Sequence, residues 1–299
     1  GEMQALEQAG ERAGVALSEM MEGAGQALAA EIYKRVGDLA GVPVALLCGA
    51  GNNGGDGFVC ARALTEKGAA CTVLLVQGEP KTQLARAAFI QMPQDVACLC
   101  TEHQAKETEE ALRQARCVVD CVFGFGFRGE LDGDAAKFIG MANKLGCLRI
   151  AADLPSGVEC DSARASEGTF RAHVTVAFSA KKPAHCSYPG KAFCGETVVA
   201  PVGIPQGLLE AAETGWFETD DAFPRQALQA GSIQANKGDF GRLLLVCGSY
   251  GMAGACIMAA RGALRCGVGL LHIAIEERAY PIVAQAVPEA FFTILRLGR

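Results

Sequence analysis

A glycine-rich segment near residue 50 combines residue types that can hold an anion or a cation. It reads Gly49-Ala50-Gly51-Asn52-Asn53-Gly54-Gly55-Asp56-Gly57, after an apolar run and before a helical pattern. Its glycines let backbone N–H groups approach an anion at a helix N-terminus, while its amide and carboxyl oxygens can bind a ligand or a hard cation. Capping of a tight turn is the alternative role. Nine such residues in a row exceed what capping needs, so we favour a binding function, and the absence of Gly-Lys-Ser/Thr excludes a Walker loop.

A second glycine-rich segment follows a later apolar run. Gly124-Phe125-Gly126-Phe127-Arg128-Gly129 matches the G-x-G-x-x-G pattern of dinucleotide-binding loops. Because residues 130–133 intervene before the next helical pattern, we interpret it as a longer phosphate-contacting loop with Arg128 as its cation. A plain glycine-rich turn is the alternative. Asp120 precedes this loop inside the apolar run, where a carboxylate must bind a cation or accept structural hydrogen bonds.

A third candidate segment, Asp153-Leu154-Pro155-Ser156-Gly157, ends another apolar run. An acid at this place would face the same crevice as the two glycine-rich loops. Asp153 could instead cap the turn set by Pro155. Ser156 lacks a G-x-S-x-G context and a nearby histidine, which disfavours a serine hydrolase.

The lysines, histidines and cysteines of the chain provide little evidence for a functional site beyond these three segments. Lys181 and Lys182 could reach a phosphate, but we expect a solvated surface pair. None of the 4 histidines is spaced i, i+4 or lies near a cysteine pair, so the sequence does not support a zinc site. The 14 cysteines include no Cys-x-x-Cys, and many lie in apolar runs. We therefore expect the cysteines to be small buried side chains and the protein to lie in a reducing, cytoplasmic compartment.

The elements that position these loops follow from the hydrophobic pattern. Fully apolar runs alternate with helical patterns, which predicts a doubly wound, Rossmann-like α/β domain whose parallel sheet is covered on both faces. The expected strands are 44–48, 71–76, 96–100, 117–123, 148–153, 174–178 and 196–200, and the expected helices are 17–36, one after Asp56, 84–92, 108–115 and 135–145.

The chain is expected to contain two domains. The first spans 1–217, and a polar stretch at 218–221 opens the second, 218–299. The second shows a strand at 243–247, a helix at 253–265, a strand at 270–275 and a further helical pattern. Its roughly 80 residues are too few for a complete parallel-sheet domain.

The composition of the chain restricts the classes of partner that it can bind. The chain is 50% hydrophobic, with a net charge of -6, so it has no basic field for a nucleic acid or an anionic membrane. No apolar stretch reaches the length of a membrane helix, and no targeting signal is visible. We expect a soluble protein that binds neither nucleic acid nor membrane.

Taken together, these segments resemble the NAD(P)H-hydrate epimerase family, or YjeF N-terminal domain, from about residue 3 to 205. The resemblance rests on Gly51-Asn52-Asn53-Gly54-Gly55-Asp56-Gly57, Val118-Val119-Asp120, Asp153-Leu154-Pro155-Ser156-Gly157, Gly195-Glu196 and Val202-Gly203-Ile204-Pro205. Residues 237–241 and 248–255 resemble the opening of the ADP-dependent NAD(P)HX dehydratase domain, which is ribokinase-like. The resemblance therefore implies the front part of a bifunctional repair enzyme, with an incomplete ribokinase-like α/β segment after the first domain.

The family resemblance implies roles for individual residues. Asp153 is the expected catalytic acid, and a potassium ion would be bound by Asn53, Asp120 and Ser156. The residues expected to bind the hydrated dinucleotide are Asn52, Asn53, Gly54, Gly55, Asp56, Gly124, Phe125, Gly126, Phe127, Arg128, Gly129, Glu130, Asp153 and, in the second segment, Ala253. ADP or ATP would be needed only by a complete dehydratase domain, and we expect no dehydratase activity from this chain.

The implied reaction can be tested against simple chemistry. In hydrated NADH or NADPH the hydroxyl lies on a carbon next to the ring nitrogen, so the nitrogen lone pair assists loss of water, which can return to either face. One carboxyl group that gives and retakes a proton suffices. Three positions depart from the family pattern. The first helix reads Glu22-Gly23-Ala24-Gly25, where the family usually has an asparagine at the second place, Glu159 replaces an aspartate, and Asn236 replaces a histidine. The alternative functions are those of an NAD(P)-dependent dehydrogenase and of a non-catalytic binding scaffold. We also expect the protein to form a homo-oligomer.

Overall fold

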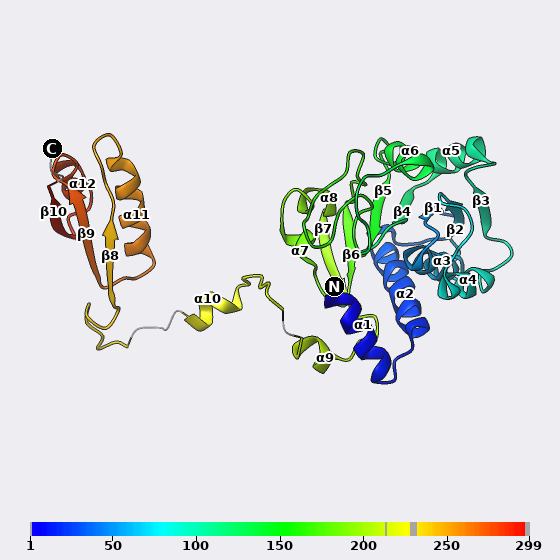
Figure 1. Ribbon diagram of the computed structural model, residues 1–299, viewed down its shortest axis with the longest axis horizontal. Coiled ribbons are helices and arrows are strands. Elements are labelled where there is room, and N and C mark those ends of the chain that lie inside the picture. The colour runs from blue at the N-terminus through cyan, green and yellow to red at the C-terminus, as the bar shows by residue number, and fades with distance from the viewer. Residues whose placement is uncertain (1, 213, 228–231, 297–299) are drawn as a thin grey trace. The chain divides into compact units, whose positions relative to one another are not determined.

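The computed structural model describes residues 2–212, 214–227 and 232–296. The chain forms two compact units, Gly1–Glu218 and Thr219–Arg299, and each is described by itself (Figure 1).

A seven-stranded parallel sheet organises the first unit. Its order is β3-β2-β1-β4-β5-β6-β7, so the chain builds outward from β1 to β3 and then returns to β4 on the other side of β1. The strands are β1 (Pro43–Cys48), β2 (Ala70–Leu75), β3 (Ala97–Cys100), β4 (Cys117–Cys121), β5 (Leu148–Ala152), β6 (Val174–Phe178) and β7 (Glu196–Ala200). This order confirms the predicted doubly wound fold, and it places a topological switch point between β1 and β4.

Helices cover both faces of this sheet (Figure 1). Alternate residues of β1 face opposite sides, as the pleat of a strand requires. Val44 and Leu46 join the core beneath α2, α3 and α4, whereas Ala45 and Leu47 join the core beneath α5 and α6. The helices are α1 (Glu2–Arg12), α2 (Leu17–Val36), α3 (Asn52–Thr65), α4 (Gln83–Ile90), α5 (Ala105–Gln114), α6 (Gly133–Ala142), α7 (Pro183–Cys186), α8 (Lys191–Cys194) and α9 (Gln206–Glu210).

Two features of the first unit differ from the sequence expectation. The helix α1 precedes the first expected helix, which corresponds to α2. The helix α3 begins at Asn52 rather than after Asp56, so the second half of the first glycine-rich segment forms the opening turns of a helix. The backbone N–H groups of these turns therefore lie at the carboxyl edge of the sheet.

Glycines in this segment permit close packing of α3 against β1 and β4. A Cβ atom at Gly54 would lie 2.0 Å from the carbonyl oxygen of Gly49, and one at Gly57 would lie 2.7 Å from Cys48 Sγ. Gly49 itself lies against the carbonyl oxygen of Val122. A side chain at these positions would push the helix away from the strands, so part of the glycine content serves packing.

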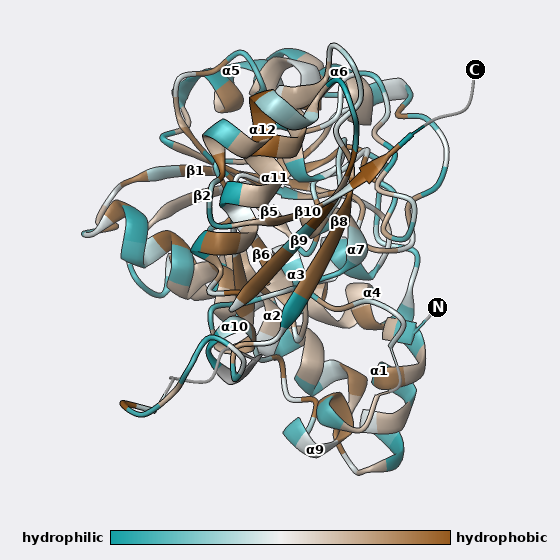
Figure 2. Cartoon of the chain, turned by 90° about the vertical axis from the view of Figure 1, so that its left-hand side faces the viewer, coloured by the Kyte–Doolittle hydropathy of each residue, from teal (hydrophilic) through white to brown (hydrophobic). Residues whose placement is uncertain are grey.

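The second unit contains a three-stranded parallel sheet of order β10-β9-β8. Its elements are α10 (Ala222–Ala227), β8 (Arg242–Val246), α11 (Ala253–Arg265), β9 (Leu270–Glu276), α12 (Tyr280–Ala286) and β10 (Phe291–Leu295). The strand β10 was not expected from the sequence. These strands are hydrophobic (Figure 2), yet Leu244 is 57% and Val246 69% exposed. The unit therefore leaves much of an apolar strand in contact with solvent.

All 14 cysteines are free thiols, and eight of them are buried. Among the cysteines that lie in apolar runs of the sequence, Cys48, Cys71, Cys117 and Cys121 are buried, while Cys247 is partly exposed. Among the residues that the structure describes, no helix is long and apolar enough to cross a membrane.

Candidate functional site at the sheet switch point

A pocket of about 450 Å³ lies in the first unit, beside the loops that follow β1 and β4. This is the place where open α/β sheets bind ligands. The helices α1 and α2 supply an apolar wall of Met3, Leu17, Met20, Met21 and Ala24. The polar side chains that line the pocket include Glu7, Asn52, Asn53, Asp56, Asp153 and Lys182.

Asp153 is held in an unusual backbone conformation at the end of β5. Its φ is 61°, in the left-handed region that an aspartate seldom adopts. Its N–H donates to the carbonyl oxygen of Val176 at 2.8 Å, and its Oδ1 accepts from the N–H of Phe178 at 3.1 Å. Backbone strain of this kind persists only where surrounding contacts fix it, and it is concentrated at functional sites.

Lys182 forms a buried ion pair with Asp153. Its ammonium donates to Asp153 Oδ1 and also to the carbonyl oxygen of Phe178, at 2.7 Å. The expectation of a solvated lysine pair is therefore wrong for Lys182, which is 5% exposed. Lys181 is exposed, as expected, and pairs with Glu218 at 2.7 Å. A carboxylate this deeply buried needs a counter-charge, and Lys182 supplies it.

His185 completes the network around Asp153. Its Nδ1 accepts from the N–H of Lys182 at 2.8 Å, so the ring proton lies on Nε2, which donates to the carbonyl oxygen of Asp153 at 2.7 Å. Burial lowers the pKa of His185, and the charge of Lys182 adds to this effect. We interpret His185 as a neutral residue that fixes the backbone of Asp153.

Two buried polar atoms at the pocket have no hydrogen-bond partner among the described residues. They are Asn53 Nδ2 and Asp153 Oδ2. Leaving such atoms unpaired costs free energy in a folded protein. Because both residues line the pocket, these atoms are available to a ligand that binds there.

Asp56 and Glu7 are further carboxyl groups at this pocket. Burial raises the pKa of Asp56 well above its usual range, and the charges of Asp153 and Glu7 raise it further. Burial also raises the pKa of the half-buried Glu7, with a further contribution from Asp153. The pocket therefore holds a desolvated Asp56 carboxyl group whose pKa is raised, together with Asp153, which is paired with Lys182.

The structure joins two of the three residues expected to bind potassium. Ser156 donates to Asp120 through its N–H at 2.7 Å and through its hydroxyl at 2.6 Å. Asp120 is fully buried, and burial raises its pKa to about 6, although hydrogen bonds from Ser156 and Val122 lower it. No described lysine or arginine pairs with it, so its partners are neutral. A cation bound by oxygen ligands fits this position, and the structural hydrogen bonds weighed as the alternative role are also present.

The other predicted contacts divide into those at the pocket and those outside it. Asn52, Gly124, Phe125, Gly126 and Phe127 line the pocket, whereas Gly54 and Gly55 are buried in packing contacts. Arg128, Gly129 and Glu130 are exposed and do not line it. Arg128 instead pairs with Asp161 at 2.9 Å. Ala253 is the first residue of α11 in the second unit.

Sequence reasoning missed Glu7, Lys182 and His185. No motif surrounds Glu7, and the pattern Lys-Lys-Pro is equally typical of a solvated surface. The short helix α7, which contains His185, follows β6 directly and brings Lys182 back to the edge of the sheet. For Lys182 and His185, the only usable signal in the sequence was their position after an apolar strand.

Comparisons with known proteins show which families and folds this chain is similar to. The family described as YjeF-related protein N-terminus matches residues 17–184, and the NAD(P)H-hydrate dehydratase family matches residues 243–296. The chain is similar in fold to a crystal structure of the yeast protein ynu0, with a TM-score of 0.57, 23% identity, and coverage of 70% of this chain and 88% of that one.

Three similar relatives are each named bifunctional NAD(P)H-hydrate repair enzyme Nnr. They come from Moorella thermoacetica (35% identity over 90% of this chain and 52% of the relative), Thermofilum pendens (33%, 96% and 54%) and Coxiella burnetii (32%, 95% and 57%). The chain thus spans about half the length of the curated relatives it matches. Because the first family match covers more than half of the chain, this chain belongs to the family of YjeF-related proteins, and its second unit matches part of the NAD(P)H-hydrate dehydratase family.

Proposed function

We propose that the first unit interconverts the R and S forms of hydrated NADH and NADPH. The observation that supports this best is a pocket at the switch point with two buried, unpartnered polar atoms, Asp153 Oδ2 and Asn53 Nδ2. The names of the relatives, which describe repair of NAD(P)H hydrates, support the substrate class.

The pocket suits the hydrated nicotinamide end of such a substrate. Its volume of about 450 Å³ and its apolar wall from α1 and α2 can hold the ring. The N-terminus of α3 can face a phosphate, because its backbone N–H groups lie beside the pocket. The predicted contacts of Arg128, Gly129 and Glu130 would then be to the outer part of the dinucleotide.

Two carboxyl groups can exchange the protons of this reaction. Asp56 donates its proton to the substrate hydroxyl, the carbon–oxygen bond breaks, water leaves, and the ring nitrogen lone pair forms a C=N bond. Water then adds to the opposite face of the same carbon, the C=N electron pair returns to nitrogen, and Asp153 Oδ2 takes the released proton. The reverse reaction uses the two groups in the opposite order, and return of the proton to Asp56 resets the pocket. One carboxyl group would suffice for this reaction, and the pocket offers three, of which Asp56 and Asp153 take these two roles.

Lys182 is a positioning residue in this scheme. Its contact with Asp153 Oδ1 leaves Oδ2 as the oxygen free to meet the substrate. Potassium would be held by Asn53, Asp120 and Ser156, where it would supply the counter-charge that the buried Asp120 lacks. Its expected effect is to order the loops that carry these residues.

We propose that residues 218–299, which comprise the second unit and the residue before it, are the opening part of the ADP-dependent dehydratase domain. We assign no reaction to it alone, and ADP or ATP would be required only by a complete domain. Incubation of the purified 299-residue chain with hydrated NADH and ADP is expected to regenerate no NADH. Appearance of the absorbance of NADH in that assay would contradict this assignment.

The direct test is a chromatographic assay in which purified R-NADHX converts to S-NADHX. The wild-type chain is expected to accelerate interconversion in potassium chloride and to do so less in choline chloride of equal ionic strength. Asp153→Asn is expected to lower the rate by about a hundredfold or more, the usual contribution of a positioned acid or base. Asp95→Asn is the matched control, because Asp95 is exposed and does not line the pocket.

The outcome of this assay separates the alternatives. A folded wild-type chain without interconversion in potassium chloride would favour a non-catalytic scaffold. Tight binding of unmodified NADH with hydride transfer to a carbonyl compound would favour a dehydrogenase. An unchanged rate in Asp153→Asn would remove Asp153 from the mechanism.

We also propose a cytoplasmic location and a homo-oligomer. The free thiols support a reducing compartment. Analytical ultracentrifugation of the purified chain is the test of assembly, and a monomer at micromolar concentration would contradict it.

A further inference from the structure

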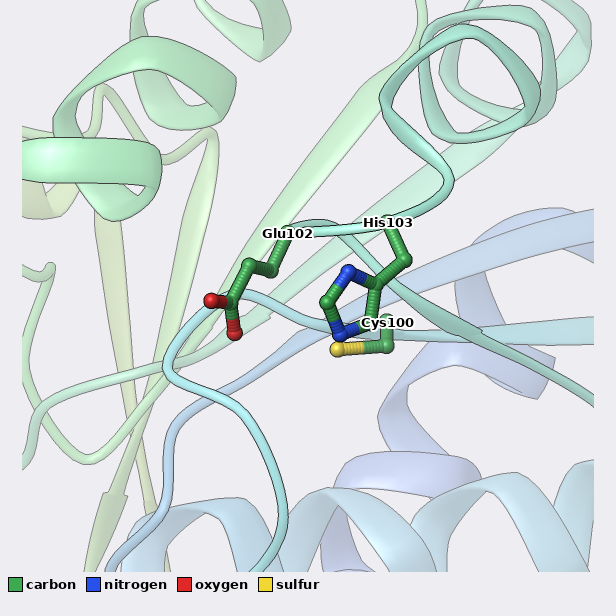
Figure 3. Close-up of side chains that lie close together, drawn as sticks. All are labelled: Cys100, Glu102 and His103. Atoms are coloured by element: carbon green, nitrogen blue, oxygen red, sulfur yellow. The ribbon is translucent and has the colours of Figure 1, made fainter.

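The turn after β3 gathers three side chains that can bind a metal ion. Cys100 Sγ, a Glu102 carboxylate oxygen and a His103 ring nitrogen all lie within 4.8 Å of one another. Figure 3 shows the imidazole of His103 directly beside the Cys100 sulfur, with the Glu102 side chain to one side of them. This cluster is the one such group of histidine, cysteine and acidic residues in the described part of the chain.

Hydrogen bonds fix the backbone of this turn. Thr101 is buried, its hydroxyl donates to Asp134 Oδ2 at 2.7 Å, and its N–H donates to the carbonyl oxygen of Leu75 at 3.4 Å. Gln104 Oε1 accepts from the N–H of Cys100 at 3.1 Å, and the N–H of His103 donates to the carbonyl oxygen of Cys100 at 3.1 Å. Because these hydrogen bonds anchor Thr101, the backbone that carries Cys100 and Glu102 on either side of it is held in place.

The three side chains themselves are not otherwise engaged. Within residues 2–212, 214–227 and 232–296, the side chains of Cys100, Glu102 and His103 make no hydrogen bond or ion pair, although the backbone N–H of Cys100 donates to Gln104. Glu102 and His103 are exposed and Cys100 is partly exposed, so an ion can reach them from solvent. None of the three lines the pocket at the switch point.

We propose that Cys100, Glu102 and His103 form a site for a divalent transition-metal ion, with Zn²⁺ as its natural occupant. Thiolate, imidazole and carboxylate are the side-chain ligands that zinc binds, and three protein ligands leave a fourth position for water. Ligand atoms around tetrahedral zinc lie about 3.5 Å apart. The observed spacing, within 4.8 Å, therefore needs side-chain adjustments of about 1 Å, which exposed side chains can make by small changes of rotamer.

The expectation of no zinc site rests on the spacing of the histidines and on the absence of histidines near cysteine pairs. His103, however, lies three residues after Cys100, in a Cys-x-Glu-His turn. The proposed site is separate from the proposed potassium ligands Asn53, Asp120 and Ser156, and its residue types differ from theirs. Soft and borderline ligands select zinc or cobalt over potassium, because potassium prefers oxygen.

The test is a titration of the full chain with Co²⁺, after removal of metals with a chelator and in the presence of a phosphine reductant. Thiolate binding produces a sulfur-to-cobalt charge-transfer band in the near ultraviolet, and tetrahedral geometry produces strong visible bands. We expect both to saturate at one Co²⁺ per chain and to disappear when Zn²⁺ is added.

Variants assign the ligands. Cys100→Ser is expected to abolish the charge-transfer band, while Glu102→Gln and His103→Gln are expected to weaken Co²⁺ binding by at least about tenfold. Cys98→Ser is the matched control, because Cys98 is an exposed cysteine of the same strand, and it should bind Co²⁺ as the wild type does. Each variant is first compared with the wild type by circular dichroism in the absence of metal.

Three results would overturn the proposal. They are no saturable Co²⁺ spectrum for the wild type, a charge-transfer band that persists in Cys100→Ser, or unchanged Co²⁺ affinity in His103→Gln. Loss of the charge-transfer band in Cys98→Ser, together with its persistence in Cys100→Ser, would show that Cys98 provides the thiolate. That result would also contradict the proposal. Epimerase rates do not enter this test, so it is independent of the proposed function.

Discussion

Asp153 and Lys182 act as a unit, because each compensates the buried charge of the other. Removing one partner of a buried ion pair leaves an unpaired charge in a medium of low polarity, which typically costs about 3–5 kcal/mol. We expect Lys182→Met to lower the free energy of unfolding by about this amount and to lower the epimerisation rate. Urea denaturation and the chromatographic assay measure the two effects.

The double variant provides the control for this prediction. Asp153→Asn combined with Lys182→Met removes both charges, so much of the lost stability should return while activity stays low. Equal stability of the single and double variants would show that the charge of Asp153 does not cause the loss.

The environment of Asp56 leads to a prediction about pH. Burial, Asp153 and Glu7 all raise the pKa of Asp56, so it keeps its proton above the usual range of an aspartate. If Asp56 is the proton donor, the rate falls as pH rises through its pKa. Removing the negative charge of Glu7 lowers that pKa, so Glu7→Gln should move the alkaline limb of the pH–rate profile to lower pH.

Glu11→Gln is the comparison for this pH profile. Glu11 lies on the same helix α1 but is exposed and does not line the pocket. Its profile should match that of the wild type. A shift of the alkaline limb to higher pH in Glu7→Gln would contradict the assignment of Asp56 as the acid.

Among the elements, α3 depends on glycine for its distance from the sheet. A methyl group at Gly54 would meet the carbonyl oxygen of Gly49 at 2.0 Å, a contact with backbone that cannot rotate away. We expect Gly54→Ala to lower the free energy of unfolding by about 1–3 kcal/mol, as overpacking typically does, although alanine favours helix formation. Thermal and urea unfolding measure this change.

Gly51→Ala is the matched control in the same segment. A Cβ atom at Gly51 meets nothing within 4 Å, and its φ of -94° is accessible to alanine. Its effect on stability should stay below about 1 kcal/mol. Equal losses in the two variants would show that glycine flexibility, rather than close packing, determines stability here.

For the whole molecule, the two units differ in how well they bury apolar side chains. The first unit has cores on both faces of its sheet, whereas the second exposes Leu244, Val246 and Met258 of its small sheet and helix. Exposed apolar surface of this kind binds hydrophobic dyes. We expect the 299-residue chain to enhance the fluorescence of such a dye, and a chain that ends at Glu218 to do so much less.

The same shortened chain tests where the proposed epimerase site lies. All residues that line the pocket belong to the first unit, so the shortened chain should keep the epimerisation rate of the full chain. A folded shortened chain with little activity would mean that the second unit contributes to the site. Undiminished dye fluorescence would place the exposed apolar surface in the first unit.

The sequence by itself predicted the architecture and the edge where the site lies. Buried parallel strands are apolar throughout and helices repeat every 3.6 residues, so local periodicity is enough to recognise the order of strands and helices. The glycine-rich segments and Asp153 follow strands, and the carboxyl ends of parallel strands meet at one edge, which is why those residues could be named in advance. Helix α1 and strand β10 were not predicted from the sequence. They lie at the two ends of the chain, where the hydrophobic pattern covers few residues.

Only the tertiary structure decided the state of the charged groups. Whether Lys182 is solvated or buried depends on its contact with Asp153, 29 residues away in the chain, and no local pattern encodes that contact. Asp56 and Glu7 come together only because α1 and the first turns of α3 line the same pocket in the folded chain. A pKa depends on burial and on neighbouring charges in space, so the tertiary fold alone determines which carboxyl group holds a proton.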